Sequence, residues 1–460
     1  MTSAALAESL VDHGLDPAER PAKQALFEHT LEQFSKLPRS PSREHADARD
    51  DIHVWWVPGR LEVYGTHTDY AGGRTLVCAV PRGFAVIARS RSDGVLHVVD
   101  ARRAQDVTFG ASDVEPFLLS SSPGWRRYVA VVLRRLARNF PDASLGADIA
   151  LASDLPSASG MSSSSALMVA VATVLVQVGG LRERIEWREN IASARDEAGY
   201  YACIENGLPF GTLSGDGGVG THGGSEDHAA ILTAVPGGLS AFAFVPMRAL
   251  DMSPLPPEWT FVITPSGVPA QKAGTARDAY NSLAEGTQIL LDLWNQETRP
   301  PARSLAAALM PDEITLQSVP SSDAVNRLCA IVRRSSVPGW PSGVLEQRLD
   351  HFIREDSRIP EAVKGFRYSD GLRVGQLAAE SQADAETLLR NQIPETTALA
   401  RSARTLGAFA SRSFGAGFGG SVWALVERDR AQDFARRWTA DAFVAAPGPP
   451  LVELTSTRLT

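Results

Sequence analysis

A guanidinium, an imidazole and two carboxylates lie close together in the segment GRLEVYGTHTDYAGG, residues 59 to 73. Arg60 and Glu62 fall in a stretch that starts like a β-strand, and His67 and Asp69 precede a double glycine. Charged and hydrogen-bonding groups gathered around a turn can bind a polar ligand. The same spacing also fits a polar turn whose side chains only satisfy local backbone groups, so the segment alone leaves both interpretations open.

A second segment, LPSASGMSSSSALMVA at residues 155 to 170, joins a loop of small residues to the expected start of a helix. Exposed N–H groups at a helix start form an anion site, and serine hydroxyls can add donors or reach a metal ion. The pattern therefore indicates a phosphate site, although a tightly packed helix start fits it equally. It is neither GxxxxGK[ST] nor GxGxxG, so it supports neither the common NTPase loop nor a dinucleotide fold.

Two glycine-rich segments are further candidates for parts of a ligand site. RSFGAGFGGSVWALV, residues 412 to 426, allows the backbone to approach a ligand closely, or forms a bulged turn. GTHGGSEDHAAIL, residues 220 to 232, places Asp227 where a glycine-rich loop enters an apolar segment. His222 and His228 flank it, but the spacing is not that of HExxH, so a zinc site is not favoured. A helix cap is the structural alternative for Asp227.

The elements that must position these residues are helices and strands in irregular order. Hydrophobic periodicity predicts helices over residues 1 to 38, 124 to 139, 161 to 178, 277 to 295 and 376 to 391. The helix at 124 to 139 is expected to turn a basic face outward. Strands are predicted at VWWVPGRLEVYG, TLVCAVPRGFAVIARSR, ADIALASDLP, WTFVITPS and SVWALVE, and a loop at residues 207 to 224. Without a regular βαβ rhythm, the fold class is α+β.

Length and composition indicate the number of domains and exclude some classes of partner. A chain of 460 residues favours two domains, which we place at residues 1–250 and 251–460 because prolines cluster just after this point. Acidic residues outnumber basic ones 53 to 45, so nucleic acid is not an expected partner. No run reaches the roughly twenty apolar residues of a membrane helix, and the amino terminus lacks the features of a secretory signal. We expect a cytoplasmic protein without a membrane partner, and the oligomeric state, monomer or dimer, stays open.

Taken together, the segments resemble the GHMP family of small-molecule kinases. PGRLEVYGTHTDYAGG is similar to the galactokinase signature, PSASGMSSSSA to the family's phosphate loop, and SFGAGFGG to its glycine-rich third motif. GWRRYV and AYN are weaker matches to galactokinase segments. The resemblance implies a two-domain GHMP kinase fold with an amino-terminal ribosomal-protein-like α/β domain, a carboxy-terminal ferredoxin-like α+β domain, and an active site in the cleft between them.

The resemblance also implies an ATP- and Mg²⁺-dependent sugar kinase that phosphorylates the anomeric hydroxyl of galactose or a closely related sugar. Ser164 takes the place of the serine that reaches Mg²⁺, which prefers such hard oxygen ligands, and Glu205 is the nearest acid for a second ligand. Trp125 could stack on adenine, with a core tryptophan as the alternative. The expected ATP-binding residues are Pro156, Ser157, Ala158, Ser159, Gly160, Met161, Ser162, Ser163, Ser164, Ser165 and Trp125.

On the sugar side, the resemblance makes Asp227 the acceptor of the anomeric hydroxyl proton. Arg60 would hold that carboxylate ionised and counter charge on the moving phosphoryl group. The expected sugar-binding residues are Thr66, His67, Asp69, Tyr280 and Gly417.

Asp216 is an alternative for the catalytic acid. GLPFG at 207 to 211 looks like a family segment that would make Asp216 the neighbouring acid. We prefer Asp227 because Gly237 and the apolar segment LSAFAFV follow it, as in galactokinases. Residues 211 to 224 would then be an insertion near the site.

Departures from the galactokinase pattern leave the sugar open. Thr66 stands where galactokinases carry a glutamate that they use on the outer hydroxyl of galactose, Glu62 and Ala71 replace asparagines, and Phe414 replaces a threonine. Loss of a carboxylate removes a charge-assisted hydrogen bond and relieves repulsion toward an acidic substrate. Galacturonate and arabinose are therefore admissible.

Two further classes are alternatives to a sugar kinase. A non-catalytic galactokinase-like sugar sensor is disfavoured because the serine loop is full length and Arg60 and Asp227 are both present. A kinase for a non-sugar alcohol such as mevalonate or homoserine is disfavoured by THTDY.

Overall fold

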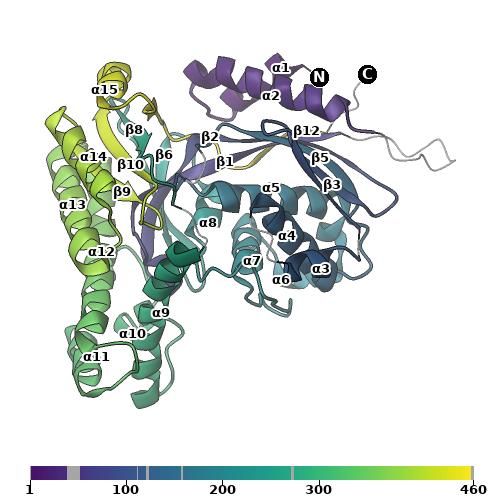
Figure 1. The fold of residues 1–460 in the computed structure, drawn as a ribbon. Coiled ribbons are helices and arrows are strands. Elements are labelled where there is room, and N and C mark those ends of the chain that lie inside the picture. The colour runs from purple at the N-terminus through teal and green to yellow at the C-terminus, as the bar shows by residue number, and fades with distance from the viewer. Residues whose placement is uncertain are drawn as a thin grey trace.

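The computed structural model describes residues 2–38, 52–110, 112–120, 124–156, 159–270 and 274–456. Two sheets organise the chain (Figure 1). The larger sheet has the strand order β12-β1-β2-β5-β3-β4, with β6 also paired to β2 and β7 to β6. Only β3 and β5 run parallel among its described pairs. Its strands are β1 (His53–Tyr64), β2 (Arg74–Ser90), β3 (Leu96–Asp100), β4 (Gln105–Phe109), β5 (Ala147–Ser153), β6 (Gly238–Ala243), β7 (Arg248–Pro254) and β12 (Val452–Ser456).

Both faces of this sheet are buried, which explains why β1 reads as a nearly continuous apolar run. Trp55 and Val57 belong to one apolar cluster, whereas Val54 and Trp56 belong to another on the opposite face. α1 (Ser3–Asp12) and α2 (Arg20–Ser35) cover the second face. Figure 1 shows the remaining helices of this half on the other side. They are α3 (Val114–Leu119), α4 (Trp125–Asn139), α5 (Ser163–Val178), α6 (Ile185–Asn190), α7 (Ala194–Asn206) and α8 (Glu226–Thr233).

The smaller sheet is antiparallel and has the order β11-β8-β10-β9. Its strands are β8 (Trp259–Pro265), β9 (Ala410–Phe414), β10 (Ser421–Glu427) and β11 (Phe443–Val444). α13 (Gly371–Asp384), α14 (Pro394–Thr405) and α15 (Ala431–Trp438) lie beside it (Figure 1). A further group of helices packs around its own apolar cluster: α9 (Gly274–Glu297), α10 (Leu305–Leu309), α11 (Ser322–Arg334) and α12 (Ser342–Arg367).

The α+β class is confirmed, and the predicted helices and strands all occur. Two details differ. Arg135 on α4 is fully buried instead of facing outward, because Nε binds the side chain of Asn139 and Nη2 the backbone oxygen of Leu208. The helix expected over 376 to 391 starts earlier, as α13, and continues into a π-helical turn at Ala385–Leu389. The division at residues 250 and 251 stays a prediction.

None of the helices in the described ranges combines the length and apolar composition that a membrane crossing requires.

Candidate active site

One cavity of about 1350 Å³, lined from both sheets, collects most of the residues expected at the site. It exceeds the roughly 300–1,000 Å³ of an ordinary small-molecule pocket and so has room for two substrates. The predicted residues that line it are Arg60, His67, Asp69, Trp125, Pro156, Gly160, Ser162, Ser163, Ser164, Ser165, Glu205, Asp227 and Tyr280.

Arg60 and Asp227 form an ion pair in this cavity. Nε of Arg60 lies 2.7 Å from Oδ1 of Asp227, and Nη1 donates to the backbone oxygen of Gly160 at 2.9 Å. The backbone N–H of Arg60 donates to the backbone oxygen of Met161 at 3.3 Å. β1 is therefore joined both to the first turn of α8 and to the serine-rich loop before α5.

Gly59 allows the serine-rich loop to approach β1 this closely. A β-carbon at position 59 would lie 2.6 Å from Cδ2 of Leu155 and 2.7 Å from the backbone oxygen of Met161. Neither distance is possible for a real side chain, so position 59 requires glycine. The pairing of β1 with β2 also shifts register between Pro58 and Arg60, a local irregularity next to the residue that enters the cavity.

Several carboxylates surround the Arg60 guanidinium. Nη2 lies 3.1 Å from Oε1 of Glu226 and 4.0 Å from Oε2 of Glu62. Burial alone would lower the pKa of Arg60, but Asp227, Glu226 and Glu62 outweigh it and raise that pKa above its ordinary value. Arg60 is therefore a fixed positive charge. Oδ2 of Asp227 accepts a hydrogen bond from the Ser165 hydroxyl at 3.1 Å, which ties α8 to α5.

The serine-rich loop lies against the glycine-rich turn between β9 and β10. Oγ of Ser421 donates to the backbone oxygen of Ser159 at 2.6 Å, and a β-carbon on Gly415 would lie 3.0 Å from the backbone oxygen of Gly160. Ser159 and Met161 are buried and do not line the cavity. Ser157 and Ala158, which are also expected to bind ATP, lie outside the described residues.

A phosphate group fits the start of α5. Ser163 is the first residue of this helix, so the N–H groups of its first turn have no partners within the helix, and Ser162, Ser163 and Ser164 line the cavity. The Ser162 hydroxyl is buried and has no hydrogen-bond partner among the described residues. A polar atom left in this state fits a site that a ligand completes.

His67, Asp69 and Tyr280, which are expected to bind the sugar, line the same cavity, and we call their part of it the sugar end. His67 adopts a left-handed conformation with φ of 61°, and its Nδ1 lies 2.9 Å from the Tyr70 hydroxyl. The rings of His67 and Tyr280 lie 5.5 Å apart. Oδ2 of Asp69 accepts a hydrogen bond from the backbone N–H of Glu226 at 3.1 Å. Burial, together with the Asp227 and Glu62 carboxylates, raises the pKa of Asp69 to about 6.

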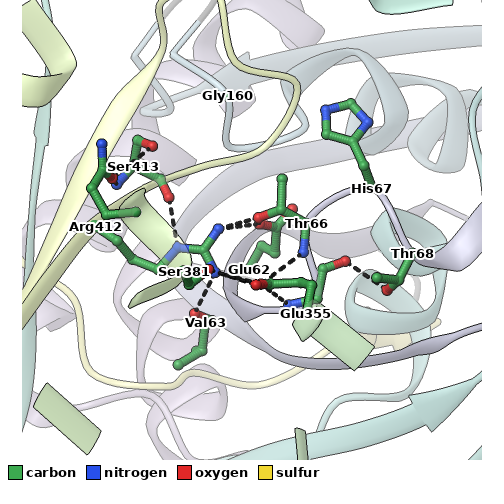
Figure 2. Close-up of polar contacts among 12 residues, drawn as sticks. Glu62, Val63, Thr66, His67, Thr68, Gly160, Glu355, Ser381, Arg412 and Ser413 are labelled. Carbon is green, nitrogen blue, oxygen red and sulfur yellow. Dashed lines mark hydrogen bonds and ion pairs between the residues drawn. The ribbon is translucent and has the colours of Figure 1, made fainter. Parts of the chain in front are cut away.

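Thr66 and Gly417, also expected at the sugar site, do not line the cavity. Figure 2 shows the Thr66 hydroxyl among Glu62 and Arg412, with the His67 ring apart from this group. Gly417 lies against Asn391, whose Nδ2 would be 2.4 Å from a β-carbon at position 417. Their sugar-binding roles therefore stay predictions that this arrangement does not support.

Sequence reasoning missed the charges that hold the turn after β1. Oε1 of Glu355 on α12 accepts from the backbone N–H of Gly65 at 3.0 Å and from Nη1 of Arg412 at 2.9 Å (Figure 2). Burial opposes ionisation of Glu355, but Arg412 and Arg358 lower its pKa well below the usual range. Because these residues come from distant elements, no local pattern could have revealed them. Glu226 was also missed, although its position next to Asp227 was a visible signal.

The cavity wall includes Trp125, the residue expected to stack on adenine. Tyr128 and Arg82 line the same cavity, and Trp125 is only partly buried, with Nε1 3.2 Å from Oε1 of Gln105. An aromatic face on a cavity wall favours the stacking role over the core alternative.

Oxygen donors are present for a magnesium ion. The Ser164 hydroxyl and the Glu205 carboxylate line the same cavity, and Oε2 of Glu205 lies 3.3 Å from Nε2 of His228. A hydroxyl and a carboxylate are the kind of hard oxygen ligands that Mg²⁺ prefers.

Asp216 lies elsewhere. Its Oδ2 is 2.9 Å from Nε of Arg134 and its Oδ1 is 3.6 Å from Nη1 of Arg135, and it does not line the cavity. The buried Arg135 on α4 thus has a carboxylate neighbour from the loop at 207 to 224. This geometry favours Asp227 over Asp216 as the acid at the site.

Three family models match separate parts of the chain. A galactokinase galactose-binding signature matches residues 43–90, the GHMP kinases N terminal domain matches residues 127–202, and the GHMP kinases C terminal domain matches residues 362–445. The Arg60 strand, the serine-rich helix and the glycine-rich turn each fall within one of them.

The individual relatives that match this chain include galactokinases. A galactokinase from Actinobacillus pleuropneumoniae is 27% identical over 398 residues, covering 85% of this chain and 90% of its own. A galactokinase from Streptomyces coelicolor is 28% identical over 394 residues, covering 85% and 89%. Among solved structures, Lactococcus lactis galactokinase complexed with galactose aligns with a TM-score of 0.69 at 21% identity, covering 87% of this chain and 95% of that one. This last likeness shows that the fold is shared.

Proposed function

Because this chain belongs to the GHMP kinase family and carries its galactokinase signature, we propose that it transfers the γ-phosphoryl group of ATP to the anomeric hydroxyl of galactose. The observation that carries this proposal is the Arg60–Asp227 ion pair, which lies in one cavity with the serine-rich loop. Phosphoryl transfer asks a protein mainly for positioning and positive charge, and this cavity supplies both.

In the proposed reaction, Asp227 accepts the proton of the anomeric hydroxyl. The sugar oxygen forms a bond to the γ-phosphorus, the bond from that phosphorus to the β–γ bridging oxygen breaks, and ADP leaves. Arg60 keeps Asp227 ionised and counters charge on the moving phosphoryl group. Ser165 holds the other oxygen of Asp227. Mg²⁺, with Ser164 and Glu205 as oxygen donors, would neutralise phosphate charge when bound.

The charges at the sugar end support a neutral sugar over galacturonate. Glu62, Asp69 and Asp227 line this end of the cavity, so a substrate carboxylate would add one more negative charge at short range. The same geometry supports an enzyme over a sugar sensor, because Arg60 and Asp227 are already paired beside the serine-rich loop.

Release of ADP tests the proposal. Purified protein with ATP and Mg²⁺ should release ADP when galactose is added, and much less with galacturonate or without sugar. ADP release with galacturonate but not galactose would reject the proposed substrate. Galactose binding without ADP release from any sugar would support the sensor instead.

A further inference from the structure

Glu226 is a buried carboxyl group at the sugar end that the proposed mechanism does not use. It is the first residue of α8, lines the cavity and is only 6% exposed. Oε1 lies 3.1 Å from Nη2 of Arg60, whereas Oε2 is buried and has no hydrogen-bond partner among the described residues. A buried carboxylate oxygen in this state costs free energy unless a ligand satisfies it.

The surroundings of Glu226 are strongly negative. Glu62 on β1, Asp69 at the turn after β1 and Asp227 on α8 all act on it, and burial together with these carboxylates raises the pKa of Glu226 well above its usual range. Arg60 opposes this effect. His67 lines the same cavity, and its ring nitrogens contact the Tyr70 hydroxyl and the backbone oxygen of Ala416.

Arg412 does not relieve the negative charge at Glu226, because its guanidinium is committed elsewhere. It contacts Glu355, Thr66, Glu62 and the backbone oxygen of Val63 (Figure 2). Four carboxyl groups therefore share little more than one guanidinium at the sugar end. A cationic group on the substrate would compensate this charge, whereas a hydroxyl would only hydrogen-bond to it.

We propose that the sugar end of the cavity accommodates an amino sugar, with the Glu226 carboxylate as the acceptor for its ammonium group. The inference rests on the proposed function, because it takes Asp227 to face the anomeric hydroxyl and Asp69 to face the ring hydroxyls. Glu226 neighbours Asp227 in the chain, and its backbone N–H binds Asp69. The Glu226 and Asp227 carboxyl groups also contact the same Arg60 guanidinium, at 3.1 Å and 2.7 Å, so an ammonium group bound by Glu226 lies near the anomeric carbon. 2-Amino-2-deoxy sugars carry that group on the adjacent carbon, and they are the substrate class that the inference names.

The test compares kcat/KM for galactose, 2-amino-2-deoxygalactose and 2-deoxygalactose at pH 7, with ADP release as the readout. The amino sugar should be preferred over galactose by about tenfold or more, because a charge-assisted hydrogen bond replaces a neutral one. 2-Deoxygalactose, which lacks a group at this carbon, should be the poorest of the three.

Glu226→Gln keeps the size of the side chain and prevents a carboxylate from forming at this position. The ratio of kcat/KM for the amino sugar to that for galactose should fall about tenfold in this variant. Glu115→Gln, at a side chain that is 66% exposed, is the matched control and should leave the ratio as it is.

A wild-type enzyme that phosphorylates galactose but does not prefer the amino sugar would overturn the inference and leave the proposed function standing. An unchanged ratio in Glu226→Gln would do the same. No ADP from any of the three sugars would overturn the proposed function as well.

If Glu226→Gln fails to fold, calorimetry on the wild-type protein tests the inference instead. Binding of 2-amino-2-deoxygalactose should release a proton from Glu226, seen as a dependence of the binding heat on the ionisation enthalpy of the buffer. Galactose should release none, and equal proton release for both sugars would contradict the inference.

Discussion

Arg60 and Asp227 are 167 positions apart in the chain, and Nε of the first lies 2.7 Å from Oδ1 of the second. The pair joins β1 of the larger sheet to the start of α8, and Arg60 also binds Gly160 in the serine-rich loop. An acid, a guanidinium and the serine-rich loop thus meet in one place, and the proposed phosphoryl transfer requires an acid, a positive charge and a phosphate site close together.

Asp227→Asn should reduce kcat about a thousandfold or more, because an amide cannot accept the hydroxyl proton. ATP affinity should stay near that of the wild type, measured by calorimetry without sugar. Asp216→Asn is the control: it removes a buried partner of Arg134 outside the cavity, so it should lower the melting temperature while turnover persists. Loss of turnover in Asp216→Asn with activity kept in Asp227→Asn would reverse the assignment of the catalytic acid.

Asp69→Asn should stabilise the protein at pH 8 while raising KM for the sugar. The pKa of Asp69 is about 6 in the fold and 3.8 without it, so folding favours the protonated form. Its stabilising contribution is complete below about pH 4 and is lost as the pH rises to about 6, which amounts to about 3 kcal/mol at pH 8. The variant should therefore melt above the wild type at pH 8, and the gap should narrow toward pH 4.

The control for Asp69→Asn is Asp433→Asn, at a side chain that is 62% exposed. It reports what removal of one surface carboxylate does to the melting temperature over the same pH range. A gap for Asp69→Asn that is no larger at pH 8 than at pH 4 would show that Asp69 ionises at its ordinary pKa.

Gly415→Ala should lower kcat by about tenfold to a hundredfold. Its φ is 81°, and a β-carbon would lie 3.0 Å from the backbone oxygen of Gly160, which accepts a hydrogen bond from Arg60. A small displacement of this oxygen moves the guanidinium that the reaction depends on. Gly407→Ala is the matched control, because its φ is 101° but a β-carbon there meets nothing within 4 Å. It should cost about 1 kcal/mol of stability and leave kcat alone; equal kcat losses in both variants would reject the contact argument.

Arg412→Leu should destabilise the protein by about 3–5 kcal/mol, because it leaves Glu62 and Glu355 buried with one fewer cation (Figure 2). Thermal denaturation measures the effect. Adding Glu62→Gln should restore part of the loss, since it removes one of the uncompensated charges. Arg436→Leu, at a 71% exposed side chain 3.6 Å from Asp433, should change stability by less than about 1 kcal/mol. Equal effects of the Arg412 and Arg436 changes would contradict the buried network.

Local sequence patterns, together with the family resemblance, were enough to select Arg60, Asp227 and the serine-rich loop, which the structure brings together in one cavity. The choice between Asp216 and Asp227 was harder, since both follow glycine-rich stretches. The structure distinguishes them through Arg134 and Arg135 on α4, which contact Asp216. Arg134 lies 82 positions before Asp216 in the chain, so no local pattern links the two.

α12 shows why the second half of the chain was harder to predict. Its buried face carries His351, Glu355, Asp356 and Arg358, so the apolar periodicity expected of a helix is interrupted where charged residues face inward. The Glu355 and Asp356 carboxylates pair with Arg412 and Arg74, which lie on strands of the two sheets. Only the tertiary fold shows that they are partners.

The most direct test of the account is the identity of the product. Galactose incubated with ATP, Mg²⁺ and the wild-type protein should give a phosphate ester at the anomeric carbon, identified by ³¹P NMR, and Asp227→Asn should give almost none in the same time. A phosphate ester at another hydroxyl, or no sugar phosphate at all from active, folded protein, would contradict the account.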